Sequence, residues 1–458
     1  MANAPGSFST RGNRNTRYGA TVALDREVVV RGLTTAMLRA AESCATVLVL
    51  ILISAAVLPL FLHEGPNLES APTTLLERVC FWMAYSFTML QVLSRPRQIF
   101  WVAMRNPFVI GVAAVAALSA IWSDDPQTSF RLSFAFCMWT LFGCYLAARY
   151  TAKQLLFHLG VAFGIVALAS LATGVLAPGY GLESGYNAGA WRGVFTTKNV
   201  LGEMMLLAAV VFGSLARGAV RFRVLAVLGL ILAIAMIALA KATAALLILA
   251  VLVITIPIVL TFRRNNAIAA LILCCLLALS AAASVLLVER DLVLSVLGKD
   301  ATMTGRTILW RQVVSHISDR PLLGHGYGAF WEATSAASER VRTAVGWDTP
   351  HSHNGLLDVW LDLGLIGVLS LLAGFALALG RAWTGLRARV GMDGVWAMTF
   401  LVMVFLGNIT ESSIFQSYLI WAIFVAVACM YWPPSSEGSG AIGVEGPPRE
   451  AAQRHRFR

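Results

Sequence analysis

Two positively charged side chains stand just before an apolar segment in the middle of the chain. Arg192 and Lys198 lie six residues apart in the stretch Trp191–Asn199. A helix starting there presents free N–H groups and a partial positive charge. Together with the two cations, that helix start is typical of a site for a phosphate-like anion. The alternative is an interfacial anchor, in which Trp191 and the cations meet lipid headgroups.

A third cation, Arg306, is expected at the beginning of another helix. The helix dipole disfavours a cation at that position. An external anion or an acidic partner would therefore explain it. The alternative is a simple salt bridge with Asp300.

Two histidines precede a third apolar segment. Asn354 fits an N-cap, which places His353 at the mouth of the helix that follows. A histidine there has a pKa range suited to a general base. His351 and His353 could also bind a metal ion, but no cysteine or carboxylate follows at a familiar ligand spacing. We therefore predict no metal, and a plain surface pair is the other alternative.

Several carboxylates lie in or near apolar segments, where an ionised group is costly and is usually functional or paired. Asp358 and Asp362 are four residues apart and share one helix face, while Glu203 lies in an earlier segment. Glu411 follows Asn408 near the end of another apolar run. For each of them, structural pairing with buried polar groups or cations is the alternative to a role in chemistry.

The composition explains what kind of scaffold must position these residues. The chain has 458 residues, of which 58% are hydrophobic and only 13% charged, with a mean hydropathy of +0.73. Soluble domains average about 25% charged residues. The net charge of +11 could suggest nucleic-acid binding, but the cations sit in short clusters between apolar runs. The lipid bilayer, and no nucleic acid, is the predicted partner.

Counting runs of about 20 apolar residues predicts an all-α polytopic membrane protein of about twelve transmembrane helices. The predicted spans are residues 44–62, 76–93, 108–122, 130–148, 155–176, 199–216, 222–240, 243–262, 267–288, 354–380, 394–410 and 413–432. The run Val224–Leu260 is too long for one span, so we expect a tight turn at Lys241.

Positive charge orients the helices. With the N-terminus in the cytoplasm, most of the 35 Lys and Arg residues fall on the cytoplasmic side. The predicted organisation is a basic cytoplasmic tail (1–43), transmembrane helices 1–9 (44–288), a large non-cytoplasmic loop (289–353), helices 10–12 (354–432) and a disordered cytoplasmic tail (433–458).

The large loop should contain one amphipathic helix near Arg306–Ser318, stopped by Pro321. Its apolar face at helical spacing is Leu309, Trp310, Val313 and Ile317. The glycine-rich stretch after Pro321 predicts a tight turn.

Three stretches, in this order, resemble the O-antigen ligase/polymerase superfamily of bacterial membrane glycosyltransferases. They are Arg192–Asn199, Gly305–Trp331 and His351–Gly367. Glu411 fits a weaker fourth pattern, and the likeness extends from about residue 120 to 430. It looks most like the ExoQ type of exopolysaccharide polymerase. Two features depart from the family: Thr197 stands where some relatives carry His, and Lys241 lies in a turn that is Ser-rich in many of them.

The resemblance implies a GT-C-like helical membrane enzyme whose site faces the periplasm from the bacterial inner membrane. Such enzymes transfer an undecaprenyl-pyrophosphate-linked oligosaccharide to the hydroxyl of an acceptor glycan, with inversion and without a cofactor or metal. The implied catalytic residues are His353, Arg192 and Arg306, and the implied substrate-binding residues are Lys198, Asn199, His351, Lys241 and Glu411. A protein that regulates chain length would be a further partner.

Three functions remain open at this point. A polymerase would join lipid-linked repeat units, whereas a ligase of the same superfamily would move a finished glycan to lipid A core or another acceptor. A polysaccharide or lipid transporter should instead carry repeated halves, broken helices and charges near the membrane midplane. We find no internal repeat, and the polar cluster is expected at the outer face, so the sequence argues against a transporter. The motifs do not separate a polymerase from a ligase, and the likeness to the ExoQ type favours a polymerase.

Overall fold

The computed structural model describes residues 14–56, 75–218, 222–262, 306–332, 335–387 and 393–430, and every regular element in these ranges is helical. One isolated antiparallel bridge, between Leu182 and Trp191, is the exception to this rule in the described ranges. The predicted all-α class is confirmed.

The helices follow the apolar segments of the sequence. In chain order they are α1 (Arg14–Ile53), α3 (Leu75–Ser94), α4 (Pro96–Ala103), α5 (Pro107–Ser119), α6 (Pro126–Arg149), α7 (Ala152–Leu176), α8 (Pro178–Gly181), η2 (Gly185–Asn187), α9 (Lys198–Gly218), α10 (Arg223–Ala240), α11 (Thr243–Phe262), α14 (Arg306–Asp319), α15 (Ala336–Val345), α16 (Gly355–Arg387), α17 (Asp393–Thr410), α18 (Ser413–Gln416) and α19 (Tyr418–Met430).

Six helices of the described part are long and apolar enough to cross a membrane, and the pair α4 and α5, bent by 100°, would make a seventh. Shorter apolar helices lie at Thr243–Pro257, Gly394–Ile409 and Tyr418–Met430. The chain is therefore a multi-pass membrane protein. The predicted span 267–288 and the predicted tail 433–458 lie outside the described residues. The number twelve and the domain boundaries stay predictions.

Local signals in the sequence begin and end several helices. The Asp125 side chain accepts a hydrogen bond from the N–H of Thr128, and Pro126 opens α6. Thr151 and Gln154 form a capping box at the start of α7. Lys241 adopts a left-handed conformation with φ 50° and separates α10 from α11. The long apolar run thus breaks at that residue.

Large aromatic side chains fill the centre of the helix bundle. Trp421 of α19 stacks on Phe136 of α6 with ring centroids 4.4 Å apart, and its indole N–H donates to Thr140 Oγ1 at 2.8 Å. Trp139 and Trp396 are also fully buried. A buried indole N–H usually finds a partner, and in Trp421 this hydrogen bond helps to fix α19 against α6.

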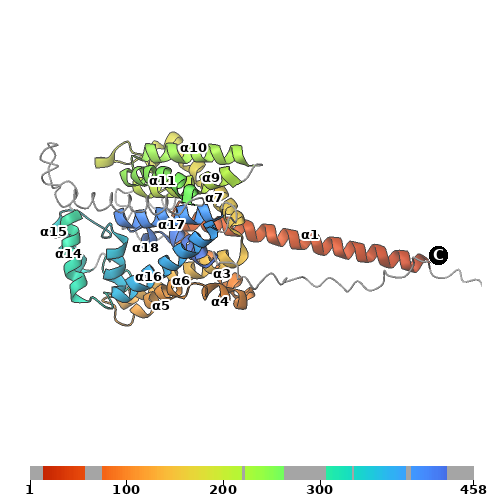
Figure 1. Cartoon of the computed structure of the whole chain (residues 1–458), viewed down its shortest axis with the longest axis horizontal. Helices are drawn as coiled ribbons and strands as arrows, with labels where there is room; N and C mark the ends of the chain where they lie inside the picture. The colour runs from red at the N-terminus through yellow and green to blue at the C-terminus, as the bar shows by residue number, and fades with distance from the viewer. Residues whose placement is uncertain are drawn as a thin grey trace, which may run out of the picture.

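The helices α14 and α15, which belong to the predicted large loop, lie together at one end of the bundle. The N-terminal part of α1 extends from the opposite end (Figure 1). Leu309, Val313 and Ile317 of α14 are buried in a small cluster that includes Leu361 of α16. The second loop helix, α15, was not predicted. It has only ten residues, and Ser335 caps its first turn.

A break inside α16 receives the glycine-rich turn that follows α14. Gly364 has φ 65° and ψ −169°, and a Cβ atom there would lie 2.1 Å from the carbonyl oxygen of Leu322. Only glycine fits both the backbone conformation and this close approach. The N–H of Leu365 donates to the carbonyl oxygen of Pro321 at 2.9 Å. The loop is therefore fastened to α16, the helix that begins next to His353.

Candidate active site

His353 sits in a tight turn immediately before α16. Its backbone is left-handed, with φ 54°, which is uncommon for a residue other than glycine. The turn is held on both sides: the indole N–H of Trp310 donates to the Ser352 carbonyl oxygen at 2.9 Å, and Asn354 Oδ1 caps the first N–H groups of α16. Strained residues of this kind persist where the surroundings hold them, and they cluster at functional sites.

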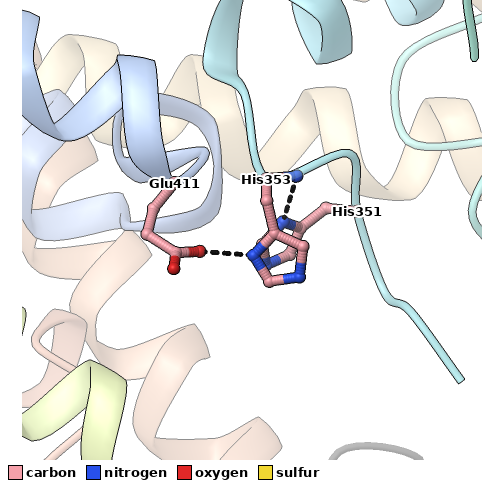
Figure 2. A group of neighbouring side chains, drawn as sticks. All are labelled: His351, His353 and Glu411. Atoms are coloured by element: carbon pink, nitrogen blue, oxygen red, sulfur yellow. Dashed lines mark hydrogen bonds and ion pairs between the residues drawn. The ribbon is translucent and has the colours of Figure 1, made fainter. Parts of the chain in front are cut away.

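The imidazole of His353 faces a carboxylate from a different part of the chain. Its Nδ1 atom lies 2.6 Å from Oε2 of Glu411, which follows the end of α17 (Figure 2). A carboxylate only accepts hydrogen bonds, so the proton of a neutral ring sits on Nδ1 and the lone pair on Nε2. Nε2 is buried, with no hydrogen-bond partner among the described residues. The arrangement matches that of a general base oriented by a carboxylate.

Arg306 binds the other oxygen of the same carboxylate. Its Nη2 atom lies 3.1 Å from Oε1 of Glu411. The acidic partner expected for this helix-start cation is therefore Glu411, 105 residues away. Asp300, the alternative partner, lies outside the described residues. Arg306, Glu411 and His353 form one hydrogen-bonded row.

Glu411 keeps its negative charge in this row. Burial raises the pKa of its carboxyl group. The hydrogen bond and charge of His353 and the charge of Arg306 together lower this pKa by more, so the net shift is downward. The carboxylate is therefore ionised at neutral pH and can stabilise a positively charged imidazole ring.

His351 packs on His353 with ring centroids 4.2 Å apart. Its Nδ1 atom accepts the backbone N–H of His353 at 3.1 Å, as Figure 2 shows, which requires an unprotonated Nδ1. Burial lowers the pKa of His351 to about 4, and the charges of Asp358 and Glu411 offset this only in part. His351 is therefore neutral at physiological pH and supports the backbone of His353.

This assignment predicts how acid affects stability. A histidine whose folded pKa lies near 4 binds no proton between about pH 4 and 6.5, whereas the unfolded chain does. Protonation therefore favours unfolding as the pH falls through that window. We expect the melting temperature of the detergent-solubilised protein to fall less between pH 7 and 5 in His351→Gln than in the wild type. Equal falls in the two proteins would contradict the neutral, buried state of His351.

A third potential metal ligand joins the two histidines. One ligand atom from each of His351, His353 and Glu411 lies within 4.8 Å of the others. Sequence spacing did not reveal this carboxylate, because it is 58 residues from His353. The same carboxylate already pairs with Arg306, whose positive charge opposes a dication. The donor set thus fits a charge-paired base better than a metal centre.

Arg192 lies in the loop before α9, in an orientation set by the backbone. Its Nε atom donates to the carbonyl oxygen of Tyr180 at 2.8 Å. The backbone N–H groups of Arg192 and Gly193 both donate to the carbonyl oxygen of Gly181. Gly193 has φ 58° and lies against Ser170, where a Cβ atom would come within 2.5 Å. The guanidinium group is therefore presented by a tight, anchored loop.

The helix start at Lys198 differs from the prediction in one respect. The expected free N–H of Lys198 donates to the side chain of Glu183 at 2.7 Å, and the N–H of Val200 donates to Thr197 Oγ1 at 3.4 Å. A carboxylate at this position satisfies the helix dipole from within the protein. An anion here would therefore depend on the side chains of Arg192 and Lys198. Asn199 is exposed on the first turn of α9.

Two contacts bring the remaining candidates to the same end of the bundle. The side chain of Glu203, on the second turn of α9, hydrogen-bonds to Ser413, two residues after Glu411. The N–H of Trp191 donates to the carbonyl oxygen of Leu239, next to the Lys241 turn. The structure thus joins His353, Arg306 and Glu411 directly, and places the loops of Arg192 and Lys241 beside the start of α9.

The buried carboxylates of α16 have protein partners. Asp362 accepts the backbone N–H of Gly328 at 3.0 Å, which fastens the glycine-rich turn. Asp358 accepts hydrogen bonds from Ser352, Trp331 and Ser412. Structural pairing, one of the two alternatives, is what the structure shows for Asp358. In Asp362 only Oδ2 is paired, and Oδ1 is buried without a hydrogen-bond partner among the described residues.

Comparison with known proteins points to one superfamily. Residues 204–372 match the protein family described as O-Antigen ligase. The matched region includes Arg306 and His353 and leaves out Arg192 and Glu411. The chain is also 37% identical over 87 residues to the exopolysaccharide production protein ExoQ of Rhizobium meliloti (strain 1021), across 18% of this chain and 19% of that protein.

The fold and the site define a polytopic helical membrane protein with a histidine, carboxylate and arginine cluster at one end of its helices. The two matches confirm that the chain resembles the O-antigen ligase and ExoQ-type superfamily, as its motifs predicted.

Proposed function

We propose that this protein is a glycosyltransferase that polymerises exopolysaccharide or O-antigen repeat units from an undecaprenyl-pyrophosphate-linked donor. The observation that carries the proposal is the row Arg306–Glu411–His353. It combines a cation for the leaving group with a histidine whose Nε2 atom has no hydrogen-bond partner among the described residues. The matches to the O-antigen ligase family and to ExoQ support the same class of enzyme.

The donor's pyrophosphate becomes the leaving group and gains negative charge as its bond to sugar carbon C1 breaks. Fixed positive groups that stabilise developing charge are among the largest contributions to catalysis. Arg192 is suited to this role because its Nε bond to Tyr180 orients the guanidinium plane. Lys198 and Arg306 would add further positive charge. Arginine can also bind two phosphate oxygens at once.

His353 would act on the acceptor. Its Nε2 atom takes the proton of the acceptor hydroxyl while the hydroxyl oxygen forms a bond to C1 and the C1–phosphate bond breaks. Attack from the face opposite the leaving group inverts the anomeric centre. The resulting positive charge on His353 is stabilised by Glu411, at 2.6 Å from Nδ1. Asn199, His351 and Lys241 stay candidates for contacts with the glycan or the lipid phosphates.

The location is part of the proposal. Most Lys and Arg residues fall on one side of the predicted spans, so that side is assigned to the cytoplasm. The site then faces the periplasm, where a lipid-linked oligosaccharide in the outer leaflet of the inner membrane can reach it. Arg192, Lys198 and Arg306 are exceptions to the charge rule. Arg306 pairs with Glu411, and an anionic donor would explain the other two.

Reconstitution tests this function directly. Purified protein in lipid nanodiscs would be given a labelled undecaprenyl-pyrophosphate-linked repeat unit, and the products separated by size. A ladder of regularly spaced products is expected for a polymerase. A single shifted product that requires lipid A core or another acceptor would establish a ligase, the function that the family description favours. No transfer to any acceptor would overturn the proposal.

The reaction is proposed to need no metal ion. Because Arg306 supplies a positive charge beside Glu411, we expect that incubation with EDTA and dialysis leave the transfer rate within about twofold of the untreated rate. The rate of reconstituted protein before and after treatment is the measurement, with Mg²⁺ or Zn²⁺ added back as the control. A large loss that an added metal restores would instead make His351, His353 and Glu411 metal ligands.

A further inference from the structure

Asp358 lies on the first turn of α16, and within the described residues its side chain hydrogen-bonds to neither His353 nor Glu411. It is 4% exposed. Its carboxylate nevertheless binds the residue before His353 and the residue after Glu411. Oδ1 accepts the backbone N–H of Ser352 at 3.0 Å, and Oδ2 accepts the hydroxyl of Ser412.

We propose that Asp358 is a positioning residue that holds His353 and Glu411 in register through Ser352 and Ser412. The proposal rests on the function proposed above. It concerns a residue that touches neither substrate nor reacting atom in that mechanism.

The His353 side of this connection is rigid. Ser352 is fully buried and every polar group on it is engaged: its N–H binds Asp358, its carbonyl oxygen accepts from Trp310, and its hydroxyl donates to the carbonyl oxygen of Asn354. Since His353 has φ 54°, its orientation depends on these neighbours. A shift of Ser352 would therefore turn the imidazole ring away from Glu411.

The link between Asp358 and the Glu411 segment is a single hydroxyl, that of Ser412. Glu411 lies between the end of α17 and the short α18, and its N–H donates to the carbonyl oxygen of Gly407 at 2.8 Å. Ser412 is 1% exposed and ties this junction to α16 through Asp358. α16 thus supplies one carboxylate that sets the distance between two segments 58 residues apart. Catalytic geometry must hold to about 0.5 Å, which is why such supporting contacts matter.

Asp358 has a third partner that provides a matched control. The indole N–H of Trp331 donates to Oδ1 at 3.0 Å, and Trp331 adjoins neither His353 nor Glu411 in the chain. Trp331→Phe and Ser412→Ala each remove one hydrogen bond from the same carboxylate. Only the second removes a link to the His353–Glu411 pair. A purely structural role of Asp358 would make the two variants equivalent.

Transfer kinetics of the four variants in nanodiscs, measured from pH 5 to 9, test the proposal. We expect Asp358→Leu to lower kcat at least tenfold with the donor KM within about twofold of wild type, and Ser412→Ala to lower kcat about three- to tenfold. Trp331→Phe should stay within about twofold. Asp358→Asn should retain most activity, because its oxygen can accept from Ser352 and Trp331 while its amide donates to the Ser412 hydroxyl.

The pH profile separates positioning from general damage. In Asp358→Leu and Ser412→Ala the acidic limb of kcat should move to lower pH, because an imidazole without its carboxylate gives up a proton more readily. The charged and titratable neighbours that remain, Arg306, His351 and Glu411, are the same in all variants. Melting temperatures identify any variant that fails to fold, in which case Ser412→Ala decides.

Two outcomes would overturn the proposal. One is equal kcat and an equal profile in Ser412→Ala and Trp331→Phe. The other is a loss confined to KM. In either case an active wild-type enzyme leaves the proposed function intact, whereas an inactive wild type would refute that function itself.

Discussion

Replacing His353 by alanine is expected to abolish polymer formation in cells that carry the variant in place of the native chain. The variant removes the Nε2 atom proposed to take the acceptor proton and leaves the charges of Arg306 and Glu411 paired. Loss of a general base typically costs 10²- to 10⁴-fold in rate. Size analysis of the extracted glycan and a transfer assay with purified protein are the measurements.

His158 offers a control for this experiment. It lies near the start of α7, whereas the other end of that helix packs near the Arg192 loop, where Gly174 meets Trp191. His158→Gln should make polymer of normal length. Both variants should reach the membrane in normal amounts, as an immunoblot of membrane fractions would show. Near-normal polymer with His353→Ala would refute the role of His353 as a base.

Arg192→Lys is expected to lose most activity, about a hundredfold in transfer rate, even though the positive charge is retained. This is the loss typical of removing one group that stabilises developing charge. Lysine has no counterpart of the Nε atom that binds Tyr180, and its ammonium group cannot contact two phosphate oxygens in a fixed plane. The initial rate with a labelled lipid-linked repeat unit is the measurement.

Arg217→Lys is the matched control, because Arg217 is exposed in the last turn of α9, at the end of the helix away from Lys198. It should leave the rate unchanged. Full activity of Arg192→Lys would reduce Arg192 to an interfacial anchor, the alternative that its neighbour Trp191 suggests.

Much of the fold could be read from local patterns. The predicted spans 130–148 and 155–176 lie within α6 and α7, because a run of apolar residues is a local property. The caps at Asp125 and Thr151, which begin these helices a few residues earlier, were not predicted. The buried face of α14 likewise follows from helical spacing. The short helix α15 was not predicted, because ten residues show too little helical periodicity to be recognised.

For the candidate site, the sequence indicated individual residues but not their partners. Arg192, Arg306 and His353 were noticed because each stands beside a helix start, which is a local property. Their partners were not visible. Glu183 binds the N–H of Lys198, and this contact changes the predicted anion site, because the helix end is already satisfied by a carboxylate.

The sequence by itself determined that this is a membrane protein. It also determined which segments are helical and which side chains are candidates for chemistry. Apolar run length, capping and charge are properties of neighbouring residues. Only the tertiary structure decided that Glu411 would join His353 to Arg306, across 58 and 105 residues, and that Asp358 would hold the two segments together. Contacts of that range depend on how whole helices pack, and no local pattern specifies them.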